Sequence, residues 1–131
     1  MESIKVYGAN STNQQPDPAR VLTEALTTAA DLMGLNKATL AKVLGISPAS
    51  AGRLYSGAYR LNQNTKEWEM ALLLVRMFRS LDAIMAGDEK ALRSWLASHN
   101  LALNACPLDM LTEASGLVHV VDYVDSYRAR I

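Results

Sequence analysis

The chain has 131 residues, of which 50% are apolar and 20% are charged, and 13 lysines and arginines balance 13 acidic residues. This profile is typical of one compact soluble domain and excludes disorder over most of the length. A single cysteine, Cys106, excludes an internal disulfide bond and a cysteine-rich zinc site, and the opening MESIKVYG contains no apolar signal stretch. No window of about 18 uncharged apolar residues could span a membrane, so we expect a protein of the reducing cytoplasm.

The charges are distributed unevenly along the chain. Residues 36–60 contain four cations and no acid, whereas residues 82–125 contain seven acids and two cations. This asymmetry predicts that the two halves of the chain contact different partners. The alternative is an unevenly charged surface that contacts only solvent.

The first 18 residues hold few large apolar side chains and end in a polar, proline-containing run. We expect residues 1–18 to form a flexible N-terminal arm, in which residues 4–7 are able to dock as a short strand. After Pro18 the apolar residues recur at spacings of three and four, which predicts a helix that ends at Gly34.

Two short helices separated by a tight turn are predicted next. The first covers residues 39–44 and ends at Gly45. The second follows Ser47, a typical N-cap residue, has Pro48 in its first turn and ends near Gly57.

The spacing of these two helices predicts a helix-turn-helix. Ala41 is small where the second helix crosses the first, and Gly45 can adopt the left-handed turn conformation. Five apolar side chains are expected to fill the wedge between the helices: Leu40, Leu44, Ile46, Ala51 and Leu54. We therefore interpret residues 19–62 as a DNA-binding region, the alternative being a helical hairpin that serves only packing.

In a helix-turn-helix, the second helix lies in the major groove with its N-terminal residues toward the bases. The outward residues there are predicted to include Ser47, Ala49 and Ser50, together with Arg53, which could pair with guanine or with phosphate. Neighbouring cations and tyrosines lie where the DNA backbone could pass. The candidate DNA-binding residues are Lys37, Lys42, Ser47, Ala49, Ser50, Arg53, Tyr55, Tyr59 and Arg60.

Thr65 is expected to cap a long helix that is predicted to run to about Ala86. This helix carries two apolar stripes, which predicts that it is covered from more than one side, as in the centre of a bundle or at a dimer seam. The stripes are Trp68, Leu72, Val75, Phe78, Leu81 and Met85, and Met70, Leu74, Met77 and Ile84.

Three shorter helices complete an all-α fold of about seven helices without a strand of useful length. Asp88 is expected to cap the first of them, and residues 99–106 to form a loop. Pro107 is predicted to open a short helix that ends near Gly116, and the last helix to cover residues 117–128.

The C-terminal half contains a series of short motifs: Trp95-Leu96, Asn100 and Leu103 in the loop, a Pro-Leu-x-x-Leu helix from Pro107, and Gly116-Leu117. This series resembles the toxin-binding domain of Xre/MbcA/ParS antitoxins. The preceding helix-turn-helix is similar to the Xre-type N-terminal domain of that family, so that the resemblance covers residues 20–131. The chain departs from the pattern at Asn104 and Ala105, where many members carry glycine, and it lacks their Gly-aromatic tail. Asparagine can adopt the left-handed turn conformation, so we expect Asn104 to be tolerated in the loop.

The resemblance implies an Xre-like helix-turn-helix domain followed by a small helical domain for dimerisation and toxin binding, at residues 63–131. It also implies a type II antitoxin that dimerises, binds its own promoter and neutralises a RES-domain toxin, an enzyme that consumes NAD. The outer face of the last helix is predicted to carry acidic and aromatic side chains, which could occupy a dinucleotide site in place of the substrate. The candidate toxin-binding residues are Asp122, Tyr123, Asp125, Ser126, Tyr127, Arg128, Arg130 and Ile131.

A catalytic or metal-binding role is disfavoured. Ser115, His119 and Asp122 would line up along one exposed helix without a water-excluded pocket or oxyanion donors. His99, Cys106 and the other candidate ligands lack any short metal-ligand spacing, so we expect no catalytic residue, metal or cofactor.

Two other functions remain open at this point. One is a dimeric Xre-type transcriptional repressor without a toxin partner. The other is a helical domain that senses a small molecule or acts as an enzyme, with Met70, Met77 and Met85 lining a ligand cavity.

Overall fold

The computed structural model describes residues 17–130 of the chain. That part forms seven helices and no strand: α2 (Pro18–Met33), α3 (Lys37–Leu44), α4 (Pro48–Ser56), α5 (Lys66–Ile84), α6 (Glu89–Ala97), α7 (Pro107–Met110) and α8 (Ala114–Arg128). The predicted all-α fold, with a helix-turn-helix followed by a helical domain, is confirmed. Most of the predicted N-terminal arm, including residues 4–7, lies outside the described residues, as does Ile131.

The first helices begin and end at residues whose local chemistry specifies an end. Asn36 caps α3 because its side chain accepts a hydrogen bond from the Thr39 amide at 2.8 Å, so the helix starts two residues before the predicted position 39. Gly34 and Gly45 end α2 and α3 in the left-handed conformation, as predicted.

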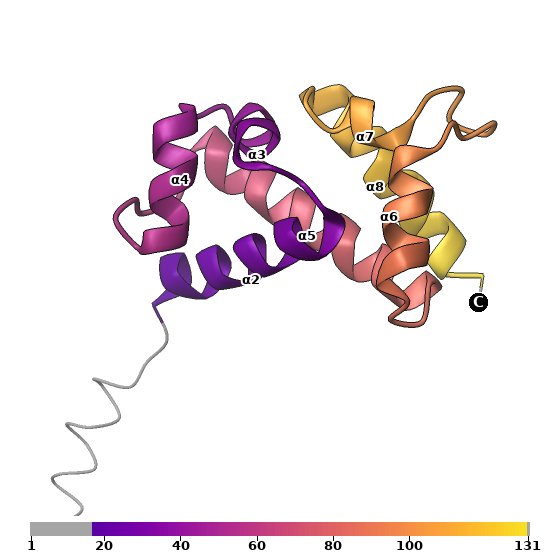
Figure 1. Ribbon diagram of the computed structural model, residues 1–131, viewed down its shortest axis with the longest axis horizontal. Helices are drawn as coiled ribbons and strands as arrows, with labels where there is room; N and C mark the ends of the chain where they lie inside the picture. The colour runs from indigo at the N-terminus through magenta and orange to yellow at the C-terminus, as the bar shows by residue number, and fades with distance from the viewer. Residues whose placement is uncertain (1–16, 131) are drawn as a thin grey trace, which may run out of the picture.

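Helix α5 is the central element of the fold. In Figure 1 it runs from the group formed by α2, α3 and α4 to the group formed by α6, α7 and α8. It packs against α2 and α3 on one side and against α8 on another, which confirms the prediction that it is covered from more than one side. Its side chains in the core include Met70, Leu74, Met77 and Leu81. It ends at Ile84, before Ala86 and Gly87 take positive φ angles of 52° and 78°.

The start of α8 differs from the sequence prediction. The helix begins at Ala114 and not at residue 117, and Gly116 lies inside its first turn. A Cβ atom at Gly116 would collide with the carbonyl oxygen of Met110, so glycine is required there by a close approach of α7 and not by a helix end. Helix α7 ends at Met110, before the predicted end near Gly116.

Arg93 of α6 joins the two groups of helices. Its guanidinium donates to the carbonyl oxygens of Leu32 at 2.9 Å and of Asp31 at 2.7 Å, at the C-terminal end of α2. Glu89 holds the same guanidinium from one turn earlier in α6, at 3.0 Å. The end of α2 is therefore capped by a cation from the C-terminal half of the chain.

Candidate functional site

The turn between α3 and α4 has the geometry that the sequence predicted. Gly45 takes a φ of 75°, and the amides of Gly45 and Ile46 both donate to the Ala41 carbonyl, at 2.8 and 3.0 Å. Ala41 is buried at the crossing, and four of the five predicted wedge residues are buried while Ile46 is half-buried. The two short helices are thus held as one rigid unit.

The outward surface of α4 is formed by small side chains and one cation. Ser47, Pro48, Ala49 and Arg53 are exposed, as predicted for three of them. Ser47 caps the helix by accepting a hydrogen bond from the Ser50 amide at 3.1 Å.

The prediction that Ser50 faces outward is wrong. Ser50 is only 9% exposed, and its hydroxyl group lies 2.9 Å from that of Ser47. Arg53 donates to the same hydroxyl group at 3.3 Å. Ser50 is therefore turned into the cap of α4 because its amide and hydroxyl complete the capping contact, and it orients Arg53 instead of facing a base.

Cations surround α4 on α3 and in the turn after α4. Lys37 and Lys42 are exposed on α3, and the Lys37 ammonium group lies 5.3 Å from the centre of the Tyr55 ring. Burial and then the nearby Asp31 carboxylate raise the pKa of Tyr55, so its hydroxyl keeps its proton at neutral pH.

Two further candidates in this region are already engaged by carboxylates. Arg60 forms two hydrogen bonds of 2.6 Å with Asp17, which lowers the pKa of Asp17. The Tyr59 hydroxyl donates to Glu67 at 2.7 Å, and this hydrogen bond raises the pKa of Tyr59. Lys37, Lys42 and Arg53 are therefore the cations of this surface that are not paired with a carboxylate within residues 17–130.

Helix α8 has four distinct sides. Leu117, Val120, Val121 and Val124 face the core. Val118, His119, Asp122 and Ser126 are exposed on the opposite side, in agreement with the outward position predicted for Asp122 and Ser126. The remaining candidates lie on the two flanks between these sides, or beyond the end of the helix, where Arg130 is exposed.

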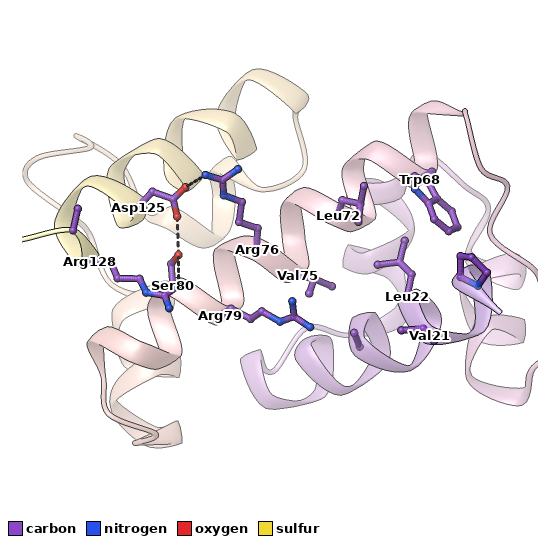
Figure 2. Close-up of a pocket in the computed structure, with 13 residues that line it drawn as sticks. Val21, Leu22, Trp68, Leu72, Val75, Arg76, Arg79, Ser80, Asp125 and Arg128 are labelled. Carbon is purple, nitrogen blue, oxygen red and sulfur yellow. Dashed lines mark hydrogen bonds and ion pairs between the residues drawn. The ribbon is translucent and has the colours of Figure 1, made fainter. Parts of the chain in front are cut away.

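The prediction that Asp125 lies on the outer face is wrong. Its carboxylate accepts a hydrogen bond from the Ser80 hydroxyl at 2.6 Å and pairs with Arg76 at 2.7 Å, and both partners belong to α5 (Figure 2). Arg128 donates to Ser80 at 3.4 Å from the next turn of α8. Asp125 therefore anchors the end of α8 to α5, because its helical position faces a buried hydroxyl and a cation.

Tyr123 is also turned inward. It is half-buried and stacks on Trp95 of α6, with ring centres 6.3 Å apart and an angle of 14° between the planes. Tyr127 lies against Tyr123 with ring centres 6.4 Å apart and keeps 45% of its surface exposed. The ring of Tyr127 is thus tilted by 44° against that of Tyr123, and it forms the free end of the ring stack of Trp95, Tyr123 and Tyr127.

Sequence reasoning missed Arg76 and Ser80. Ser80 is 1% exposed and lies among the apolar residues of α5. A lone serine within an apolar stripe was the signal that could have identified it, because a buried hydroxyl group needs a partner.

The loop between α6 and α7 has the predicted turn chemistry. Asn104 takes a φ of 54°, which asparagine tolerates. The Asn100 side chain accepts a hydrogen bond from the Leu103 amide at 3.0 Å, and an antiparallel bridge joins Asn100 to Ala105. The absence of glycine at positions 104 and 105 is therefore compatible with a closed loop.

The structure also bears on the catalytic and sensing interpretations. Ser115, His119 and Asp122 are exposed along one side of α8. Met70 and Met77 are buried in the core, whereas Met85 lines a smaller pocket with Trp95 and Tyr123, so the three methionines do not line one common cavity. No cluster of three or more potential metal ligands occurs within residues 17–130.

Two family comparisons divide the chain at α5. The antitoxin Xre-like helix-turn-helix domain matches residues 13–76, and the antitoxin Xre/MbcA/ParS C-terminal toxin-binding domain matches residues 80–130. The chain belongs to the Xre family of antitoxins. No individual curated protein matches this antitoxin.

The antitoxin thus combines a DNA-binding helix-turn-helix with a toxin-binding domain. Its central helix α5 contains both the end of the first match and the start of the second. Families of this kind are typically regulators and not enzymes. Across residues 17–130, no helix of the antitoxin is both long and apolar enough to cross a membrane.

Proposed function

We propose that this antitoxin neutralises a RES-domain toxin that degrades NAD, and that the end of α8 covers the active site of the toxin. It also represses its own operon as a homodimer in the bacterial cytoplasm. Residues 19–62 supply the DNA contacts, and residues 63–131 supply the dimer and toxin contacts.

One observation carries this proposal: the toxin-binding match ends in a helix whose exposed residues include one acid, Asp122, and one aromatic residue, Tyr127. Asp122 is exposed on the outer side of α8, and Tyr127 is exposed at the free end of the ring stack. A site that binds a dinucleotide offers cations to phosphate groups, so a carboxylate and an aromatic ring can take the place of phosphate and base.

The residues on the flanks of α8 position this surface. Asp125, held by Ser80 and Arg76, anchors the last turns of the helix, and Trp95 supports the two tyrosines. An anchored side chain loses less conformational freedom on binding than a mobile one, which favours affinity.

The DNA contacts follow from the exposed part of α4. Ser47 and Ala49 lie at its N-terminal end, and Arg53 lies one turn further along. We infer that Arg53 contacts guanine or phosphate, and that Lys37 and Lys42 contact the backbone. In a homodimer, two copies of α4 would contact half-sites about 34 Å apart, so the operator is expected to be palindromic.

The proposal is tested by co-expressing the tagged antitoxin with its chromosomal neighbour and measuring NAD consumption with and without the antitoxin. A stable complex that stops NAD loss supports toxin inhibition. Tyr127→Ala should release the toxin while Arg53→Ala should not, which separates the toxin surface from the DNA surface.

A dimeric repressor without a toxin is the alternative. It predicts specific binding to the chain's own promoter, no complex with the neighbouring protein, and no rescue of growth by the antitoxin. That combination of results would contradict the proposal.

A further inference from the structure

A groove open to solvent lies between α2, α5 and the C-terminal end of α8, and its volume is about 1100 Å³ (Figure 2). One end of it is apolar. Val21 of α2 and Leu72 of α5 each keep 49% of their surface exposed there, and the half-buried Trp68 lies beside them. Large exposed aliphatic side chains that line one groove from neighbouring helices are more typical of a contact surface than a singly exposed residue is.

The other end of the groove is basic. Arg76 and Arg79 of α5 and Arg128 of α8 line it, and Asp125 is the sole carboxylate among the lining residues. Asp125 already accepts from Ser80 and pairs with Arg76. The groove therefore presents an apolar end and a basic end with two arginines in excess.

The dimensions favour a helix as the occupant. Pockets for small molecules have volumes of about 300–1,000 Å³ and enclose most of the ligand, whereas this groove has a volume of about 1100 Å³ and is open to solvent. A channel between helices with an apolar floor suits an amphipathic helix from a partner.

The charge argues against two other occupants. A twofold contact between copies would pair two grooves that each carry two arginines in excess, with no free carboxylate among the described lining residues to pair with them, which is unfavourable. The chain's own residues 1–16 contain one acid, Glu2, and one cation, Lys5, so they bring no net negative charge.

We propose that the groove receives an amphipathic helix of the toxin, with apolar side chains against Val21 and Leu72 and carboxylates against Arg79 and Arg128. The groove is continuous with the toxin-binding domain, because Ser80, Asp125, Arg128 and Ala129 form one wall of it and fall within residues 80–130. The opposite wall belongs to the helix-turn-helix match, so the toxin contacts both parts of the antitoxin. This inference rests on the proposed function.

Cysteine protection tests the groove directly. Val21→Cys is introduced in a Cys106→Ala background, and the rate of maleimide labelling is compared for the antitoxin alone and in its purified complex with the toxin. We expect labelling of Val21→Cys to slow by about tenfold in the complex. The matched control is Ala58→Cys, in the exposed turn after α4, whose labelling rate is expected to stay the same.

The outcomes separate this inference from the proposed function. An intact, inhibited complex in which Val21→Cys reacts at its free rate overturns the groove contact and leaves the proposed function standing. Absence of any complex overturns both. Protection of Val21→Cys in the free antitoxin, if it grows with concentration or disappears when residues 1–16 are deleted, assigns the groove to a second copy or to the chain's own N-terminal segment and overturns the inference.

A second set of variants gives an independent measurement. Leu72→Glu and Arg79→Glu alter exposed positions of α5, so the fold is retained, and each is expected to weaken toxin binding by about tenfold or more. Ala58→Glu introduces the same charge outside the groove and is expected to leave toxin affinity unchanged. Unchanged affinity of both α5 variants, measured by calorimetry, would contradict the groove contact.

Discussion

Helices α4 and α8, which we propose face DNA and toxin, build their surfaces differently. The outer side of α4 carries small residues such as Ala49, and its charge is supplied mainly by Lys37 and Lys42 of α3. Helix α8 carries its own long side chains and holds them through α5 and α6, as Asp125 and Tyr123 show.

The difference matches the shape of the expected partners. A helix with small side chains can approach the base edges of a major groove about 12 Å wide, while cations from neighbouring elements contact the phosphates. An enzyme's active site is instead occupied by long side chains, and these bind best when their rotamers are already restricted. The antitoxin thus has one helix with short outer side chains, α4, and one helix with long side chains that are anchored by neighbouring helices, α8.

A deletion at the C-terminus is expected to have the largest effect, and it separates the toxin surface from the DNA surface. Deleting residues 126–131 removes Tyr127 and the end of α8 but keeps the buried valines and the contact of Asp125 with α5. We expect loss of rescue in toxin-expressing cells, with operator affinity and thermal stability close to those of the full chain. Growth assays and mobility-shift titrations measure the two activities. Rescue by the shortened chain would move the inhibitory surface to another part of the toxin-binding domain.

Two glycines inside helices offer a matched test of packing in the two regions. Gly116→Ala would place a Cβ atom against the Met110 carbonyl, so we expect a loss of about 1–3 kcal/mol in the free energy of unfolding. Gly52→Ala in α4 meets no atom within 4 Å and should add about 0.5–1 kcal/mol, because alanine favours the helix. Denaturant titrations of both variants measure these changes. Equal shifts in the same direction would mean that α7 does not approach α8 as closely as described.

Operator binding should distinguish the arginines of the DNA surface. Arg53→Ala is expected to cost about 1–3 kcal/mol, or roughly fivefold to 150-fold in operator affinity, because Arg53 is exposed on α4. Arg60→Ala should cost less, since Asp17 already pairs with that guanidinium. Mobility-shift titrations at two salt concentrations measure both variants. A larger loss for Arg60→Ala would show that the Asp17 pair opens when DNA binds.

Helix ends were predictable from the sequence where their signals are local. Ser47, Thr65 and Asp88 were predicted as N-caps, and each accepts a hydrogen bond from the amide three residues later, at 3.1, 3.4 and 3.1 Å respectively. These signals depend on neighbours within one turn of helix, which the sequence displays directly.

The flanks of helices were not predictable in the same way. Apolar periodicity identifies the buried side of α8 but not which flank faces α5, and Asp125 meets Ser80 from 45 residues away. Gly116 was predicted as a helix boundary because glycine is common at such places, whereas packing against the Met110 carbonyl decides its position. Candidate site residues chosen from helical spacing alone therefore include anchors, such as Asp125 and Tyr123, beside the exposed residues.

The smallest expected effect is a change in Tm, and it concerns the ion pair between Asp17, at the start of α2, and Arg60 of the DNA surface. Arg60 lowers the pKa of Asp17 below its usual 3.8, and the Asp17 side chain also caps α2 through the Ala19 amide at 3.1 Å. A carboxyl group whose pKa is lowered by folding adds stability above its unfolded pKa and loses that contribution as the pH falls through the folded pKa. Asp17→Asn should therefore lower Tm slightly at neutral pH, and the difference from the parent chain should shrink as the pH falls below 3.8.

Thermal unfolding from pH 7 down to about pH 2 measures this dependence, because a paired aspartate protonates only below its ordinary pKa. Asp122→Asn on the exposed side of α8 is the control, and its Tm difference from the parent chain should not follow the same profile. A constant difference for Asp17→Asn across the range would mean that Arg60 does not hold Asp17 in solution. Arg60 would then be as free to contact phosphate as Lys37 and Lys42, and the DNA surface would gain a cation that the ion pair otherwise restrains.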